Sequence, residues 1–293
     1  MRVMGVVLAI AVALSAAATF GADVANEVYI YKGGSLNQEG LGASSWGSGR
    51  AMETKEHPLT GSYSVKIITN GLYSGGRIDF PQPVTLFAGA PEKDRYVVLS
   101  FFFNDVTRVD PSAGTNNEID AEAYSIPKAN KVRFIFRDDK GTSTAVEEPT
   151  NALDRDDNWV RIAVPLTKLR VSEGAQGYKL SRLLVFTDIP TTFYLGEIKL
   201  ATDTMPIKAE INGTQMFGIN TKEFFLGVAG GGLSTLKYSW DFDAQDGLQS
   251  EATGMVVNHV FTTAGDFKIT LTVSDVNGIK PPAVVTYDIT ANG

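Results

Sequence analysis

Tyr238-Ser239-Trp240-Asp241-Phe242-Asp243 sets the pattern from which the fold of this 293-residue chain can be predicted. Trp240 and Phe242 alternate with polar residues, which places both aromatic side chains on one face of a strand. The stretch Phe267-Lys268-Ile269-Thr270-Leu271-Thr272-Val273 alternates in the same way, and Gly265 permits the turn before it. The two patterns predict strands whose apolar faces meet in one core.

Three separated pieces occur in order in the C-terminal part: the Trp240 string, Asn258-His259-Val260-Phe261, and residues 265–275. From about residue 206 to residue 290 they resemble a PKD domain, an immunoglobulin-like β-sandwich. The resemblance implies a spacer or interaction module of an extracellular protein, and it implies a structural role for His259. The tight Gly-Asp-Gly that usually follows Trp-Asp-Phe in the family is replaced here by the longer Asp243-Ala244-Gln245-Asp246-Gly247.

Asp241, Asp243 and Asp246 form a cluster of carboxylates in this longer turn. Calcium is bound by oxygen ligands such as carboxylates, so calcium is the one candidate cofactor that the sequence suggests. The alternative is that these residues form the turn by accepting hydrogen bonds from nearby backbone N–H groups, with no metal.

The rest of the chain is also rich in strand patterns and shows no sustained helical periodicity. Short β-rich runs occur at 62–68, 96–103, 132–137, 159–164, 183–187 and 193–200, bounded by Gly, Pro, Asn and Asp. Charge usage changes near residue 203, since residues 201–293 hold five Lys, no Arg and ten acidic residues. We therefore predict an all-β protein with two β-sandwiches in series, at 23–202 and 203–293.

Three pieces of the N-terminal part carry a looser resemblance: residues 61–67 with 73–80, residues 158–166, and residues 193–200. Together they look like the galactose-binding-like jelly roll found in many carbohydrate-binding modules. Gly196-Glu197 departs from the Asp-Asp or Asp-Glu that often precedes the closing Ile. The resemblance implies a domain that binds a glycan.

Sugar binding uses aromatic platforms beside hydrogen-bonding groups, because sugar rings have apolar faces rimmed by hydroxyls. Trp46 and Tyr73 lie on predicted loops and are the aromatic candidates. A Trp46 that folds back to cap the sandwich is the alternative. Arg77 and Asp79 share a face of their predicted strand and could join a polar binding surface, whereas Trp159 opens a strand and is expected in the core.

The string Asn117-Glu118-Ile119-Asp120-Ala121-Glu122-Ala123-Tyr124 places four polar side chains on one strand face. They are Glu118, Asp120, Glu122 and Tyr124. The string matches the Glu-Ile-Asp-x-Glu signature of laminarinase-type glycoside hydrolases, which implies Glu118 as nucleophile, Glu122 as acid/base and Asp120 as the residue tuning them. On a regular strand the two glutamates lie about 13 Å apart at Cα, whereas retaining hydrolysis needs carboxyl groups roughly 5–5.5 Å apart.

A second interpretation of this string is a hairpin with residues 131–137. Matching polar faces pairs Glu122 with Arg133 and Glu118 with Arg137, so that ion pairs line one sheet face. A third is a polar ligand-binding face that includes Arg133 and Arg137. The last two interpretations are compatible with each other.

The composition excludes several classes of function. The chain has no cysteine, two histidines and a net charge of -7. Disulfides, thiolate zinc sites, iron–sulfur clusters and thiol nucleophiles are therefore excluded. The acidic balance argues against nucleic acid as a partner, because phosphate binding needs clusters of Lys and Arg.

Residues 1–22 have the three parts of a secretory signal peptide: Arg2, the apolar run at 3–14, and Ser15-Ala16-Ala17-Ala18. Cleavage after Ala18 fits the small-x-small rule better than cleavage after Ala22. No later segment is apolar enough to span a bilayer. We expect an exported protein that is secreted, periplasmic or held at the cell surface.

The sequence favours a non-enzymatic binding protein. The jelly roll would recognise a glycan or another extracellular polymer, and the PKD-like module would act as a spacer or contact other surface proteins. A small glycoside hydrolase that uses Glu118, Asp120 and Glu122 is one alternative. A purely structural surface component without a small ligand is the other.

Overall fold

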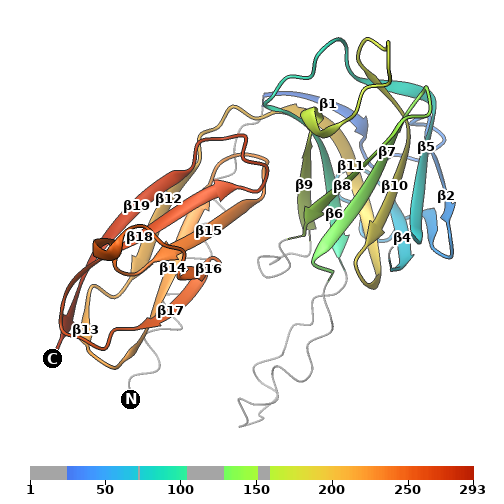
Figure 1. The fold of residues 1–293 in the computed structure, drawn as a ribbon. Coiled ribbons are helices and arrows are strands. Elements are labelled where there is room, and N and C mark those ends of the chain that lie inside the picture. The colour runs from blue at the N-terminus through green and yellow to red at the C-terminus, as the bar shows by residue number, and fades with distance from the viewer. Residues whose placement is uncertain (1–24, 72, 104–128, 151–158) are drawn as a thin grey trace, which may run out of the picture. The chain divides into compact units, whose positions relative to one another are not determined.

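A computed structural model describes residues 25–71, 73–103, 129–150 and 159–293 of the chain. The chain divides into two compact units between Thr202 and Asp203, and each is a β-sandwich (Figure 1). The expected all-β class and the two sandwiches are confirmed. No helix in the described part of the chain is both long enough and apolar enough to cross a bilayer. The predicted signal peptide lies outside the described residues.

The N-terminal unit contains eleven strands in its described residues. They are β1 (Ala25–Tyr31), β2 (Gly42–Trp46), β3 (Arg50–Thr54), β4 (Ser64–Asn70), β5 (Gly75–Phe87), β6 (Arg95–Phe103), β7 (Lys131–Asp138), β8 (Ser143–Pro149), β9 (Trp159–Pro165), β10 (Tyr178–Thr187) and β11 (Pro190–Thr202). A short 3-10 helix, η2 (Leu166–Lys168), follows β9.

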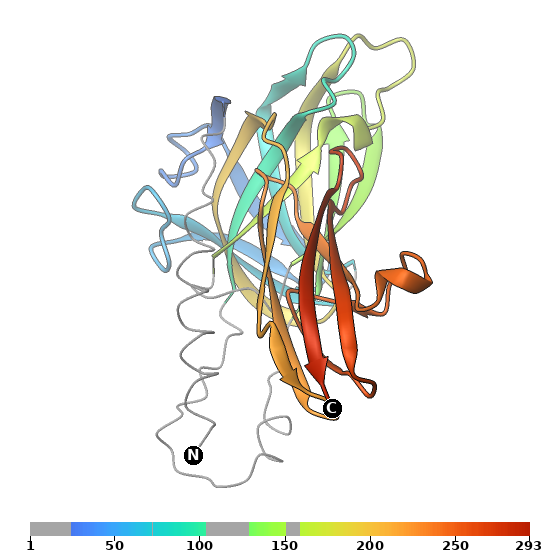
Figure 2. The same ribbon diagram turned by 90° about the vertical axis from the view of Figure 1, so that its left-hand side faces the viewer.

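These strands form two antiparallel sheets, which the two views in Figures 1 and 2 show from different sides. The six-stranded sheet has the order β3-β4-β11-β6-β9, with β1 also pairing with β11. The five-stranded sheet has the order β2-β5-β10-β7-β8. The strands of the five-stranded sheet come from widely separated parts of the sequence, so this sheet gathers distant residues on one surface.

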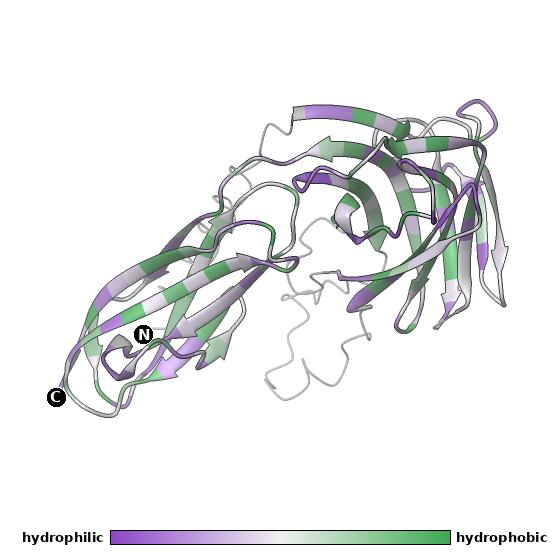
Figure 3. Cartoon of the chain, turned by 45° about the horizontal axis from the view of Figure 1, so that its top comes forward, coloured by the Kyte–Doolittle hydropathy of each residue, from purple (hydrophilic) through white to green (hydrophobic). Residues whose placement is uncertain are grey.

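The core of the N-terminal unit lies between the two sheets. Side chains alternate along each strand, and Figure 3 shows the resulting hydrophobic and hydrophilic bands. On β7 the inward residues are Val132, Phe134 and Phe136, all fully buried. They pack with inward residues of β6 and β11 such as Phe101 and Phe193. The alternate residues of β7 therefore point away from the core.

The C-terminal unit contains the remaining strands of the described chain. They are β12 (Lys208–Gly213), β13 (Met216–Gly218), β14 (Lys222–Gly230), β15 (Leu236–Asp241), β16 (Ala252–Thr253), β17 (Val256–Val260), β18 (Gly265–Asp275) and β19 (Ala283–Asn292). They form a three-stranded sheet, β12-β14-β17, and a five-stranded sheet, β13-β19-β18-β15-β16. All pairs are antiparallel except β13 with β19.

Trp240 lies at the centre of the C-terminal core. The indole is fully buried, and its Nε1–H donates to the carbonyl oxygen of Gly254 at 2.8 Å. Trp240 pairs with Leu271 across β15 and β18, and Phe242 stacks at 6.4 Å from the Trp240 ring. The alternation of both predicted strands is therefore confirmed, with the aromatic and aliphatic residues facing one core.

Candidate functional site

The surface of the N-terminal five-stranded sheet that faces away from the core is called the outer face. It brings together six residues for which the sequence predicts ligand contacts: Trp46, Tyr73, Arg77, Asp79, Arg133 and Arg137. Their strand neighbours, such as Ile78 and Phe134, point into the core. Strand alternation therefore places the polar and exposed aromatic residues together.

The aromatic end of the outer face comprises Trp46, Tyr73 and Phe186. Trp46 is the last residue of β2 rather than part of a loop, and it pairs with Gly75. It is 36% exposed, and Tyr73 in the β4–β5 turn is 63% exposed. The Tyr73 ring lies 6.2 Å from that of Phe186, and its hydroxyl accepts a hydrogen bond from Arg133 Nη1 at 3.1 Å. The exposed Tyr73 ring thus lies beside a guanidinium and a buried aromatic ring.

Tyr73 has an uncommon backbone conformation. Its φ of 66° lies in the left-handed region, which bulky residues rarely adopt and which costs about 1–3 kcal/mol. The Arg133 guanidinium, 5.6 Å from the ring centre, and the contact with Phe186 help to hold it. Asn26, His57 and Asn220 also have a positive φ, so the backbone conformation of Tyr73 alone assigns it no function.

The arginine end of the outer face is built around Asp79. The Arg77 Nε lies 2.7 Å from one Asp79 oxygen, and the Arg182 Nε lies 2.9 Å from the other. Arg137 opposes Arg182 across β7 and β10. The structure contains no partner for the Arg137 side chain among the residues it describes. Two guanidinium groups therefore meet one carboxylate, and a third arginine lies on the neighbouring strand.

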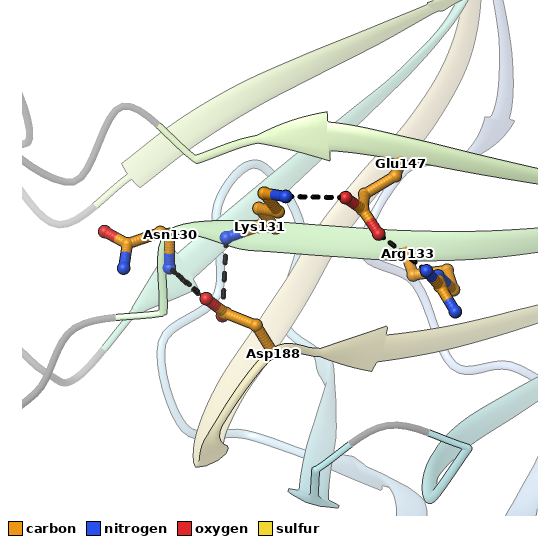
Figure 4. Close-up of polar contacts among 5 residues, drawn as sticks. All are labelled: Asn130, Lys131, Arg133, Glu147 and Asp188. Atoms are coloured by element: carbon orange, nitrogen blue, oxygen red, sulfur yellow. Dashed lines mark hydrogen bonds and ion pairs between the residues drawn. The ribbon is translucent and has the colours of Figure 1, made fainter.

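Glu147 on β8 is the other carboxylate of this surface. Its side chain lies between Lys131, at 2.9 Å, and Arg133, at 2.8 Å (Figure 4). Hydrogen bonds from Lys131 and then Arg133 hold the pKa of Glu147 below its ordinary value. Asp188, after β10, accepts from the backbone N–H of Asn130 at 3.1 Å and thereby fixes the start of β7 (Figure 4).

The predicted hairpin between residues 118–124 and 131–137 is wrong. Strand β7 pairs along its length with β10 on one side and with β8 on the other, so neither edge remains for a third strand. The cross-strand partner of Arg133 is Glu147, not Glu122. The alternation of side chains along a strand determines which residues share a sheet face, but it does not determine which strand is the neighbour. Glu147 therefore meets the requirement that polar faces match as well as Glu122 does.

Glu118, Asp120, Glu122 and Tyr124 lie outside the described residues. Their predicted roles as ligand contacts, or as the carboxylates of a glycoside hydrolase, stay predictions from the sequence.

Trp159 was expected in the core, and this expectation is wrong. It lies on the opposite side of β9 from Val160 and Ile162, which are in the core. Its ring packs edge-on to Phe102 at 5.6 Å on the outward side of the six-stranded sheet, and His57 stacks on Phe102 at 3.9 Å. The parity of Trp159 against Val160 and Ile162 was the signal that could have shown this.

Gly196 accounts for the departure from the carbohydrate-binding pattern at Gly196-Glu197. A Cβ at this position would collide with the indole of Trp159 and with the Cβ of Leu59. The pairing of β11 with β6 also shifts register between Leu195 and Glu197. The glycine therefore makes room for an indole that crosses from β9.

Two of the three aspartates of the C-terminal turn accept hydrogen bonds from backbone N–H groups. Asp241 is buried and accepts from the N–H of Asp243 at 3.0 Å and from that of Gln249 at 2.8 Å. Asp243 accepts from the N–H of Gln245 at 3.1 Å at the start of η3 (Ala244–Asp246). No group of three or more His, Asp or Glu suited to a metal ion occurs within the described ranges. Both Asp241 oxygens and Asp243 Oδ1 thus bind backbone donors.

We expect Asp241→Asn to lower the free energy of unfolding of the C-terminal unit by about 1–3 kcal/mol, because an amide would turn a donor toward one of two partly buried N–H groups. Chemical denaturation with calcium and with a chelator measures this. The loss should be equal in both conditions. If calcium stabilises the native protein but not the variant, these carboxylates bind the metal instead.

His259 has the structural role that the resemblance implies. It lies on β17, and its ring stacks on Phe242 at 4.2 Å and meets Phe261 at 4.6 Å. Burial lowers the pKa of His259 from its ordinary value, with a smaller opposing effect of the Glu251 charge. The histidine is therefore part of the aromatic packing of the C-terminal unit.

Comparisons with known proteins find a similarity in the C-terminal unit. Residues 223–290 match the family model described as the PKD domain. One similar solved structure is the PKD domain of an M14-like peptidase from Thermoplasmatales archaeon SCGC AB-540-F20. It is 15% identical, with 31% of this chain and 100% of that chain covered and a TM-score of 0.27.

A second similar structure comprises three N-terminal domains of the bacteriophage RB49 Highly Immunogenic Outer Capsid protein (Hoc). It is 12% identical, with 76% of this chain and 59% of that chain covered and a TM-score of 0.27. None of the curated proteins matches the chain. The jelly-roll resemblance of the N-terminal unit therefore stays a prediction, and the resemblance of the C-terminal sandwich to a PKD domain is supported for residues 223–290.

Proposed function

We propose that this protein is an exported, non-enzymatic binding protein whose outer face recognises a glycan. The observation that carries the proposal is the aromatic end, where Tyr73 exposes its ring beside the Arg133 guanidinium and Trp46 is exposed on the same sheet face. A sugar ring stacks an apolar face on an aromatic side chain and offers hydroxyls to nearby donors. The aromatic end supplies both kinds of group on one surface.

The PKD domain suits a supporting role in this proposal. The C-terminal unit has its own buried core around Trp240, so it can act as a spacer or as a contact for other surface molecules. Residues 201–293 have a net charge of -5 and contain no arginine, whereas the outer face is rich in arginine. Export rests on the signal-peptide pattern at residues 1–22. The expected partners are a polysaccharide or another extracellular polymer, and surface proteins.

A glycan array tests the proposal with the full chain. We expect binding to at least one polysaccharide and a loss of affinity of about tenfold or more in Trp46→Ala and in Tyr73→Ala, as for an aromatic anchor at a binding surface. Tyr29→Ala is the matched control, because Tyr29 is 38% exposed on β1 of the other sheet.

Two outcomes of the array would contradict the proposal. A blank array favours the purely structural surface component. An array on which all three variants bind like the native chain shows that a glycan binds away from the aromatic end.

A further inference from the structure

The outer face carries an excess of positive charge in a protein whose net charge is -7. Its described charged strand side chains are six cations and two carboxylates: Arg77, Lys131, Arg133, Arg137, Lys179 and Arg182, with Asp79 and Glu147. The sign of this surface is therefore opposite to that of the whole chain. A surface with clustered positive charge attracts anionic ligands and has little electrostatic attraction for neutral ligands.

Asp79 shows how the arginine end holds a carboxylate. Arg77 and Arg182 both bind it through Nε. A guanidinium carries five N–H donors, so the Nη donors of both arginines remain for another acceptor. Within the described residues the guanidinium of Arg137, which lies on the neighbouring strand, forms no hydrogen bond or ion pair. The arginine end thus has unused donors in the geometry that a planar carboxylate matches.

The two ends of the outer face are separated along the strands. Gly75 opposes Trp46 at the aromatic end, and Asp79 lies four residues further along β5. Four residues of a strand span about 13 Å, which is more than a single sugar ring can reach. A ligand that contacts both ends must be a polymer with rings for the aromatic end and anionic groups for the arginine end.

We propose that the ligand of the outer face is a polysaccharide of uronic acids. Its carboxylates bind Arg137 and the Nη groups of Arg77 and Arg182, while one of its rings stacks on Trp46 or Tyr73. This inference rests on the proposed glycan-binding function and names its ligand class. A uronate chain fits both ends, because each unit joins a ring to one carboxylate.

The first test compares polymers by titration of the full chain with polygalacturonate and alginate, each beside its methyl ester. We expect the esters to bind at least about tenfold more weakly than the acids. Esterification removes the carboxylate charge, and hydrogen bonds to a charged carboxylate are stronger than hydrogen bonds between neutral groups. Binding of the uronates should also weaken as salt rises.

The possible results separate this inference from the proposed function. Esters that bind as tightly as the acids, with dependence on Trp46, overturn the uronate ligand and leave glycan binding intact. Tighter binding of dextran sulfate or of single-stranded RNA than of either uronate also overturns it. If no polysaccharide binds, the proposed function fails as well.

The second test uses Arg137→Gln, which breaks no hydrogen bond or ion pair among the described residues and should leave folding unchanged. We expect about tenfold weaker uronate binding. Lys237→Gln, an exposed site on β15, makes the same change in charge away from the outer face and should have no effect. Equal affinities of the two variants would overturn the assignment of the arginine end, and equal unfolding midpoints check that both fold.

Discussion

Replacing Asp203 by alanine is expected to lower the free energy of unfolding of the C-terminal unit by roughly 3–5 kcal/mol. The Asp203 carboxylate lies 2.6 Å from the Lys280 ammonium, and the side chains are 0% and 7% exposed. It also accepts from the N–H of Leu233 at 2.7 Å and from that of Met205 at 3.1 Å. Its loss leaves a buried ammonium whose remaining acceptor is the carbonyl of Gly231.

Denaturation followed by Trp240 fluorescence measures this effect, in a Trp46→Phe and Trp159→Phe background that silences the other two tryptophans. Asp288→Ala is the control. It breaks the Lys268–Asp288 pair, whose side chains are 53% and 79% exposed, and should cost less than about 1 kcal/mol. A loss in Asp203→Ala no larger than in Asp288→Ala would show that the buried pair does not anchor this unit.

Gly75→Ala is the second large expected effect, about 3 kcal/mol of stability lost from the N-terminal unit. A Cβ at Gly75 would collide with the carbonyl oxygen of Val185 and lie 3.1 Å from the Phe186 ring. A backbone oxygen cannot move aside as a flexible side chain can, so β5 and β10 must separate. Because Gly75 pairs with Trp46 of the aromatic end, glycan affinity should fall together with stability.

Gly42→Ala is the matched control for this change. Gly42 pairs with Asp79 on the same outer face, and its new Cβ would lie 3.8 Å from the nearest atom, the Cβ of Asp79. We expect a change within about 1 kcal/mol, since only the freedom of glycine in a strand is altered. Thermal unfolding of both variants makes the comparison. Equal midpoints would contradict the close approach of β10 at Gly75.

The strands could be predicted from the sequence because alternation is a local property. The expected run at 132–137 lies within β7, and the run at 267–273 lies within β18. Alternation also predicted correctly which sheet face Trp240, Arg77 and Asp79 lie on. For Trp159 the large apolar ring was given more weight than its parity, and its place on the outward side was missed.

Partners across the sheet could not be predicted, because they depend on contacts between distant residues. Arg133 takes Glu147 where the parity rule also allowed Glu122, since that rule contains no information on strand order. Arg182 completes the arginine end from 103 residues beyond Asp79. Lys280 and Asp203 are 77 residues apart. In each case the sequence shows the charged residue but does not show which distant residue it pairs with.

Covalent footprinting tests the central claim, that the outer face holds the polymer, without any substitution. Hydroxyl radicals oxidise exposed aromatic side chains, and Trp46, Tyr73 and Tyr29 are all exposed in the free protein. The oxidation of Trp46 and Tyr73, taken as a ratio to that of Tyr29, corrects for radicals that the polymer consumes. We predict that saturation with a bound polysaccharide lowers both ratios severalfold. Unchanged ratios at saturation would contradict binding at the outer face.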